Sequence, residues 1–363
     1  MNTIQNLTMI KDLVSLPKEL LKEICTNSDL STDGTTQDLA GRIWGRVREG
    51  TEIQNRTLDS VKDKLMAGKT SVTWYSTTNG DLFGAKELII QNSGRFNPFE
   101  RVVVPQREAV TSTPVLIGAA PGETDHEYYL RFIYKCGVGF DYYRDMVPFP
   151  KTKLCTVYIN EERGIVEVRA EPKVANEIAS TIFTLINQRT FMEQFRVLAP
   201  FGNSVGEFAD ALGGEVIDTS SKPEMFLEDF TNEQAEASVD ILKALDSFFS
   251  NEDIEILQEN LEHAQEVFGE NILETPFTAI ILAGLQKVSM GSDKELRGQP
   301  LYDFLSPYLQ HQTGFIRFSF PENGVLKPYT IRVGLRVNSI FFVSAANESV
   351  INYIRERIIY NND

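Results

Sequence analysis

Cysteine, histidine and long apolar runs are all scarce in this sequence of 363 residues. Cys25, Cys136 and Cys155 are far apart and follow no zinc-binding spacing, so we expect reduced thiols and no disulfide framework. No apolar run approaches the roughly 20 residues of a membrane-spanning helix. The first residues also lack the basic and apolar regions of a signal peptide. These absences predict a cytoplasmic protein without a membrane partner.

Recognisable catalytic motifs are missing as well. His126, His263 and His311 are far from one another in sequence, which gives no ligand spacing for a metal. No nucleophile elbow, Walker loop, zinc-protease motif or dinucleotide-binding fingerprint occurs. We therefore predict no catalytic residue, no metal site and no cofactor, and we favour a non-enzymatic protein.

One pattern keeps a metal-dependent nuclease open as an alternative. Glu171 and Lys173 form a Glu-x-Lys motif after the strand-like segment GIVEVRA, and Glu167 and Asp145 are conceivable partners. In such enzymes carboxylates hold Mg²⁺ and a lysine steadies the attacking water. Pro172, however, is typical of a helix start, and Glu-x-Lys is frequent by chance.

Acidic residues outnumber basic ones, but the excess of acidic residues is confined to one part of the sequence. The net charge is −16, and residues 201–275 alone hold 19 acidic and two basic side chains, a local charge of −17. The rest of the chain therefore sums to +1, and the first 70 residues balance at ten against ten. This acidic block is a solubilising surface or a docking surface for a basic partner. A nucleic-acid-binding N-terminal region remains compatible with the charge.

Residues 15–47 predict two short amphipathic helices around a turn. Ser15 and Pro17 are suited to the start of the first helix, whose apolar face holds Leu20, Leu21 and Ile24. The segment Thr35-Thr36-Gln37-Asp38 predicts a capping box for the second helix. Leu39, Ile43 and Val47 recur every four residues and form its apolar face.

This segment resembles the SAP family of small helix–extended–helix nucleic-acid-binding modules. The matching pieces are LLKEIC, DLSTDGT and DLAGRI, and they cover about a tenth of the chain. The family has a phosphate-facing lysine just after the Gly-Thr of the turn, where this sequence has Thr36. The resemblance implies nucleic-acid binding, DNA being favoured, and Lys18, Lys22, Arg42 and Arg46 are the candidate phosphate contacts because each pair is one helical turn apart. The alternative is that these cations only solvate the helices.

The remaining chain predicts an α+β fold in four stretches. A helical head over 1–69 is followed by an α+β domain over 70–200, an acidic and mainly helical segment over 201–275, and a C-terminal α+β unit over 276–363. Helices are expected over 51–69, 172–189, 239–249 and 254–268, with Ser250 and Asp253 forming a cap for the last of them, and residues 201–226 are expected to include a loop. Two segments, beginning at Cys155 and Tyr329, share a strand–turn–strand–helix order, which suggests two related ββα units.

Aromatic residues accompany basic ones in the predicted strands. Trp74, Tyr75, Tyr128, Tyr129, Tyr142 and Tyr143 lie beside Arg131, Lys135 and Arg144. Exposed rings of this kind would stack on single-stranded nucleic acid, whereas buried rings would only fill the core. The leading hypothesis is a nucleic-acid-binding protein whose larger body binds a protein partner. The alternatives are an interaction scaffold without nucleic-acid binding and, third, the nuclease.

Overall fold

The computed structural model describes residues 1–77, 82–94, 96–186, 192–223, 231–251, 254–268, 288–306 and 309–360. The chain divides into two compact units. The first contains Met1–Asn203, Glu207–Gly214 and Arg317–Asp363, and the second contains Ser204–Gly206 and Glu215–Ile316. The predicted boundary at residue 69 does not separate compact units, because the helical head belongs to the first unit.

The first unit is a mixture of helices and antiparallel strands, which confirms the predicted α+β fold class. Its helices are α1 (Ile10–Val14), α2 (Lys18–Asn27), α3 (Thr36–Val47), α4 (Thr51–Leu58), α5 (Lys62–Leu65), α6 (Ala85–Asn92), α7 (Pro172–Ile186) and α13 (Glu348–Ile354). Its strands are β1 (Ser71–Ser76), β2 (Val115–Pro121), β3 (Glu127–Asp141), β4 (Val147–Asn160), β5 (Ile165–Arg169), β6 (Glu193–Gln194), β10 (Val325–Gly334) and β11 (Ile340–Phe342). Two further elements, α8 (Val205–Ala211) and β9 (Leu309–Glu322), contribute residues to both units.

The sheet of the first unit is centred on β1. Its order is β2-β3-β4-β5-β1-β11-β10, and β6 also pairs with β1. All three partners of β1 are antiparallel to it: Trp74 is opposite Glu167 of β5, Tyr75 is opposite Gln194 of β6, and Val72 is opposite Ile340 of β11. Strand β1 therefore joins a half-sheet from the middle of the chain to one from its end.

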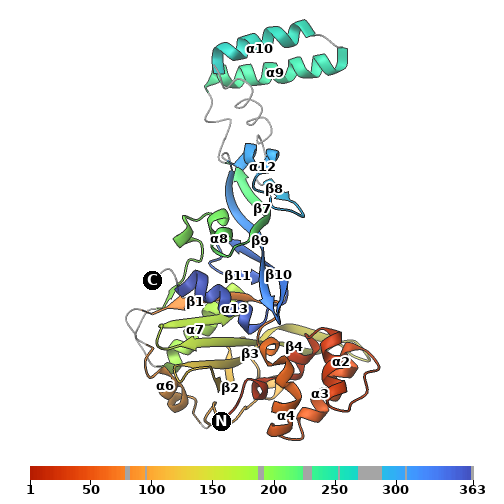
Figure 1. Cartoon of the computed structure of the whole chain (residues 1–363), viewed down its shortest axis with the longest axis vertical. Helices are drawn as coiled ribbons and strands as arrows, with labels where there is room; N and C mark the ends of the chain where they lie inside the picture. Colours follow the sequence, from red (N-terminus) through yellow and green to blue (C-terminus); the bar gives the residue numbers. More distant parts are fainter. Residues whose placement is uncertain are drawn as a thin grey trace. The chain divides into compact units, whose positions relative to one another are not determined.

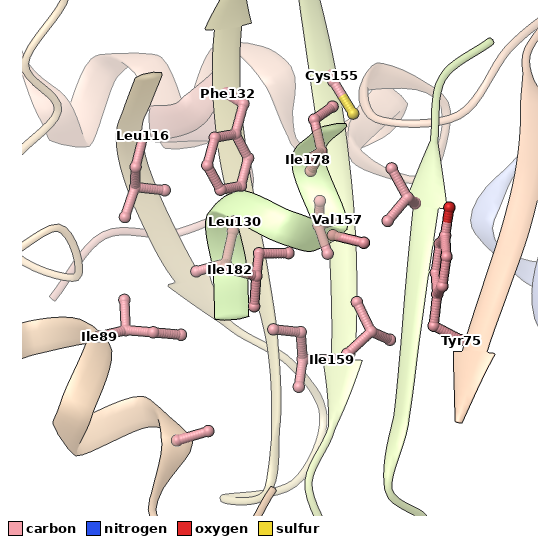
Figure 2. Close-up of a cluster of buried hydrophobic side chains, with 14 of the residues drawn as sticks. Tyr75, Ile89, Leu116, Leu130, Phe132, Cys155, Val157, Ile159, Ile178 and Ile182 are labelled. Carbon is pink, nitrogen blue, oxygen red and sulfur yellow. The ribbon is translucent and has the colours of Figure 1, made fainter. Parts of the chain in front are cut away.

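Side-chain alternation along these strands gives the sheet two buried faces. On one face Leu130, Phe132, Val157 and Ile159 pack against α6 and against α7, as Figure 2 shows. Helix α7 presents Ile178 and Ile182 to this core, which is the spacing expected of one helix face. The helix predicted over 172–189 is confirmed as far as Ile186, and its last residues lie outside the described part.

The N-terminal helices cover the opposite face (Figure 1). Tyr129 and Tyr158, which alternate with the residues above, pack in one cluster with the apolar faces of α2 and α3. Asp12 of the head also forms a buried ion pair with Arg131 of β3. The head is thus held by the sheet, and its outer surface alone is available to a partner.

The capping of the first predicted helix differs from expectation. Helix α2 begins at Lys18 with Pro17 as its N-cap residue. The additional helix α1 ends at Ser15, whose hydroxyl donates to the carbonyl oxygen of Asp12. Ser15 is therefore the C-cap residue of α1 and not the N-cap residue of α2. Its hydroxyl bonds to a residue that precedes it in the chain. The helix predicted over 51–69 is also interrupted, by the 3-10 turn Asp59–Val61.

Helix α13 is attached to the same face by buried charges. Glu167, fully buried on β5, accepts hydrogen bonds from Trp74 at 2.9 Å, Arg169 at 2.9 Å and Arg355 at 2.8 Å. Arg169 also forms an ion pair with Glu348 of α13, and Arg355 belongs to the following π-helical turn, Arg355–Ile359. These four charged side chains sum to zero, so the network is internally compensated.

The predicted strand–turn–strand–helix order is present twice. Strands β4 and β5 precede α7, and β10 and β11 precede α13. The two helices lie on opposite faces of the sheet: α7 packs on the face of Leu130, and α13 contacts Arg169 on the other. A half-turn rotation about the axis of β1 would place β4, β5 and α7 where β10, β11 and α13 lie. Such a rotation exchanges the two sides of the sheet and also its two faces.

The second unit contains β7 (Glu215–Pro223), β8 (Val288–Gly291), α9 (Asn232–Asn251), α10 (Ile254–Phe268) and α12 (Pro300–Leu305). The first part of β9 neighbours β7, which pairs with β8. Helices α9 and α10 confirm the two predicted helices, and their shared core is small: Ala237, Ile241 and Ala264. The stretch 201–226, expected to include a loop, also contains α8 and β7, whose Val205, Phe208 and Val216 are buried. The predicted cap at Asp253 lies outside the described residues.

Candidate nucleic-acid interface

The candidate interface is the outer surface of α2 and α3. Leu21, Ile24, Leu39 and Ile43 are fully buried between the helices and the sheet, so the predicted apolar faces are confirmed, although Leu20 is only half-buried. The capping box predicted at the start of α3 is also confirmed: the Thr35 hydroxyl accepts from the Asp38 N–H at 3.3 Å, and the Asp38 carboxylate accepts from the Thr35 N–H at 2.8 Å. This fixes where α3 begins.

The turn before α3 requires a glycine. Gly34 has φ +105°, and a Cβ there would lie 2.8 Å from Oδ2 of Asp38. Arg42 braces the same turn from α3, because its Nη1 donates to the carbonyl oxygens of Ser31 at 2.8 Å and Asp33 at 2.5 Å. Of the four predicted phosphate contacts, Arg42 is thus the one that stabilises the protein's own backbone, through hydrogen bonds to the turn.

The other three cations face solvent. Lys18 is exposed in the first turn of α2. Lys22 and Arg46 form ion pairs with Glu19 at 3.3 Å and Glu49 at 2.6 Å, both three residues away on the helix surface. Exposed pairs of this kind contribute about 0–1 kcal/mol and are screened by salt. They therefore leave both cations able to exchange a carboxylate for a phosphate.

Cations from both helices act electrostatically on the Asp38 carboxyl at the start of α3. Its pKa is lowered first by the hydrogen bonds from the backbone and hydroxyl of Thr35, and then by the charges of Arg42 and Lys18. Lys18 of α2 and Arg42 of α3 thus act on one point. Thr36, the first residue of α3, is half-buried and adds no charge there.

A 310 Å³ cavity lies beside the start of α2. Leu16, Pro17 and Leu20 line it, together with Lys64, Glu322, Lys327 and Tyr329. Its charged groups already pair with one another: Lys327 and Lys64 are 2.6 Å and 3.4 Å from Glu322, and Lys327 followed by Lys64 lowers the pKa of that carboxyl. Because two lysines share one carboxylate, the charged groups that line the cavity sum to +1.

The nuclease constellation is not assembled. Glu167 is enclosed by Arg169, Arg355 and Trp74, whereas Glu171 is exposed and pairs with Lys153 at 2.5 Å. Asp145 is exposed at the far end of the β3–β4 hairpin. Among the described residues, no group of three or more His, Cys, Asp and Glu side chains could hold a metal ion.

A serine–histidine contact in the second unit has the appearance of a catalytic pair. The Ser221 hydroxyl is 2.7 Å from Nδ1 of His311, and Nε2 of His311 is 3.2 Å from the hydroxyl of Tyr302. Burial lowers the pKa of His311, and Ser221 is fully buried on β7. A nucleophile must reach its substrate, so this hydrogen-bonded group is structural.

No protein-family model matches the chain, and no curated protein is significantly similar to it. None of the described helices has the length and apolar character needed to cross a membrane.

Of the six aromatic residues singled out in the sequence, the two at the end of the β3–β4 hairpin are exposed, and the sequence left this alternative open. Four of the six aromatic residues singled out in the predicted strands, Trp74, Tyr75, Tyr128 and Tyr129, are buried in the cores. Tyr142 and Tyr143 are 72% and 90% exposed. The signal was present in the run Asp141–Asp145, where charges flank the two rings and exclude a buried strand.

Proposed function

We propose that this protein binds nucleic acid, DNA in particular, through the outer surface of α2 and α3. Lys18, Lys22 and Arg46 contact phosphates, and Arg42 holds the turn that positions the two helices. The observation that carries the proposal is that Lys18, Lys22 and Arg46 lie on the outer surface of two helices whose connecting turn is braced by Arg42. The resemblance to SAP modules supports the same surface.

Electrostatics favour a phosphate at this position. The first turn of α3 carries the positive end of the helix dipole, and the neighbouring cations add full charges. Asp38 and Asp33 oppose them, and the head as a whole is neutral. We therefore expect binding that does not read base sequence and that weakens steeply with salt.

The test is a fluorescence-anisotropy titration of the full chain with a labelled DNA duplex at two salt concentrations. The variant K18E/K22E/R46E should bind at least about tenfold more weakly, and the salt slope should fall by about 0.9 for each lost phosphate contact. Arg42 is left intact because its loss would also release the turn. Conversely, Thr36→Lys should strengthen binding and steepen the slope by about one phosphate contact.

A matched control reverses three charges elsewhere. Lys62 and Lys243 also form exposed ion pairs with residues three positions away, and Lys294 is exposed. The variant K62E/K243E/K294E has the same net charge as the test variant. If both variants lose affinity equally, the effect is one of overall charge and the proposed interface is wrong; the same holds if neither differs from the wild type.

A protein-binding role for the second unit is a separate candidate. Helices α9 and α10 bury little of their apolar surface in their own core, and Val239, Leu242 and Ile254 are 47%, 43% and 55% exposed. Acidic residues surround them, which suits a partner with basic residues around an apolar centre. Affinity capture tests this: the partner should be retained by the intact protein and lost with V239D/L242D.

A further inference from the structure

The β3–β4 hairpin extends beyond the sheet as a two-stranded arm. Strand β2 pairs with β3 only over 128–133, and β5 pairs with β4 only over 156–160. The two strands continue to pair with each other as far as Asp141 and Val147. Residues 136–151, called the arm from here on, therefore have no sheet neighbour on either side.

Contacts at the base hold the arm in place. Lys11 donates to the backbone and hydroxyl of Thr152, and Arg107 donates to the carbonyl of Pro150 at 3.2 Å. The Arg107 guanidinium also lies 4.4 Å from the centre of the Phe149 ring, which covers Gly139 on the opposite strand. Because an isolated two-stranded hairpin is only marginally stable, these contacts define the direction of the arm.

The far half of the arm exposes an unusual set of apolar side chains. Phe140, Tyr142 and Tyr143 are 43%, 72% and 90% exposed, and the rings of Phe140 and Tyr142 are 6.1 Å apart. Val138, Met146 and Val147 are also exposed beside them. The cores described above do not use these side chains, so their exposure is not explained by folding.

Cations line the arm from its base toward the rings. Lys11 and Arg107 are exposed, Lys151 is exposed on β4, and Lys135 is half-buried on β3. The region is thus basic in a chain whose net charge is −16. Exposed rings next to a basic track are the combination that binds single-stranded nucleic acid, since bases stack on the rings and phosphates follow the cations.

Two other occupants fit less well. Asp141, Arg144 and Asp145 are interspersed among the rings, and inserting the tip into a lipid membrane would desolvate all three charges. Addition of a partner strand along β4 is opposed by Pro148 and Pro150, which have no N–H to donate. Carboxylates beside the rings are compatible with bases, because they accept hydrogen bonds from base amino groups.

We infer that the arm is a second nucleic-acid contact that binds single-stranded DNA by stacking bases on Phe140, Tyr142 and Tyr143. This inference rests on the proposed function and extends it from duplex phosphates to unpaired bases. The rings belong to residues 140–143 and the duplex contacts to residues 18–46, so separate variants address them. Lys11 and Arg107 position the arm and lie where the phosphates of the bound strand would continue.

The experiment compares full-length variants in their binding to labelled oligodeoxythymidine. F140A/Y142A/Y143A should bind at least about tenfold more weakly than the wild type, given the usual contribution of base–aromatic stacking. Y142F/Y143F keeps the rings and should retain binding. F83A/L326A is the matched control, because both side chains are exposed, at 56% and 69%, and lie outside the arm; it should bind like the wild type.

A second probe separates stacking from charge. An abasic oligonucleotide of the same length has the phosphates without the bases, so the wild type should bind it more weakly than oligodeoxythymidine. Equal binding of the two probes, or wild-type affinity in the triple alanine variant, overturns the inference. Ring-dependent binding to phosphatidylserine vesicles without ring-dependent DNA binding overturns it in favour of a membrane contact.

The outcomes also distinguish this inference from the proposed function. If K18E/K22E/R46E loses duplex binding while the triple alanine variant keeps oligodeoxythymidine binding, the head is confirmed and the arm is refuted. If the head variant binds duplex normally while the arm variant loses single-stranded DNA, the arm stands and the head assignment fails.

Discussion

At the scale of single residues, Glu167 is the buried acceptor for Trp74, Arg169 and Arg355. Burial by itself would raise the pKa of this carboxyl, but Arg355 and Arg169 outweigh burial and hold the pKa below its ordinary value of 4.5. The carboxylate therefore stays ionised in the folded protein. Its removal would leave both guanidinium groups with too little negative charge nearby.

We expect Glu167→Gln to lower the free energy of unfolding by about 3–5 kcal/mol, the usual cost of breaking a buried ion pair from one side. Chemical denaturation at neutral pH measures it. Glu171→Gln is the control, since Glu171 is 67% exposed in its pair with Lys153 and should change stability by less than about 1 kcal/mol. Equal effects of the two substitutions would contradict the structural role of Glu167.

The same residue predicts a dependence on pH. The folded-state pKa of Glu167 is below the unfolded-state value, so its stabilisation is present above pH 4.5 and is lost as pH falls below that value toward the folded-state pKa. Unfolding midpoints measured across this range should therefore fall less steeply in Glu167→Gln than in the wild type.

The sequence pattern predicted contacts between residues close together in the chain, but not contacts between residues far apart in the chain. The Thr35–Asp38 capping box could be predicted because both partners lie within one helical turn. The strand IVEVR instead suggests that Glu167 and Arg169 face solvent, because they alternate with Val166 and Val168. They are buried because α13, which begins 181 residues after Glu167, covers that face; nothing near Glu167 in sequence indicates it.

At the scale of elements, the turn between α2 and α3 determines whether the predicted interface exists. Its geometry depends on Gly34, whose φ of +105° disfavours any side chain. We expect Gly34→Ala to lower the free energy of unfolding by about 1–2 kcal/mol and to weaken duplex binding. Thermal unfolding followed by anisotropy titration measures both effects.

Helix α3 supplies the opposite control for this prediction. Gly41 is exposed in the middle of the helix, and a Cβ there would meet no atom within 4 Å. Gly41→Ala should therefore stabilise the protein by about 0.5–1 kcal/mol, because alanine loses less backbone entropy in a helix. If both alanine substitutions had the same sign, the assignment of the left-handed turn would be wrong.

The arm illustrates what element-level prediction could not provide. The alternation of β-branched and aromatic residues correctly indicates strands over 127–138 and 153–160, but not the strand residues between them. How far each strand extends beyond its neighbours depends on the lengths of β2 and β5, and therefore on sheet pairing. Tyr142 and Tyr143 are exposed because β3 and β4 extend beyond β2 and β5. The residue pattern within a strand does not predict this extension.

At the scale of the whole molecule, the first unit needs the end of the chain. Deleting residues 348–363 removes Glu348 and Arg355 from the buried network and uncovers Glu167 and Arg169. We expect the shortened protein to lose its cooperative thermal transition and to become sensitive to protease at temperatures where the wild type is resistant. A sharp transition in the shortened protein would show that the network is dispensable.

Strand β1 pairs with β5, β6 and β11, and β11 ends 266 residues after β1. During synthesis, Ser71 and Val72 of β1 therefore lack their partners in β11 until β11 has been made. A premature stop between β1 and β11 leaves this part of β1 open to pairing with other chains. Products shortened in this way should therefore aggregate more readily than the intact protein, and chaperones that shield unpaired strands should bind the growing chain until β11 emerges.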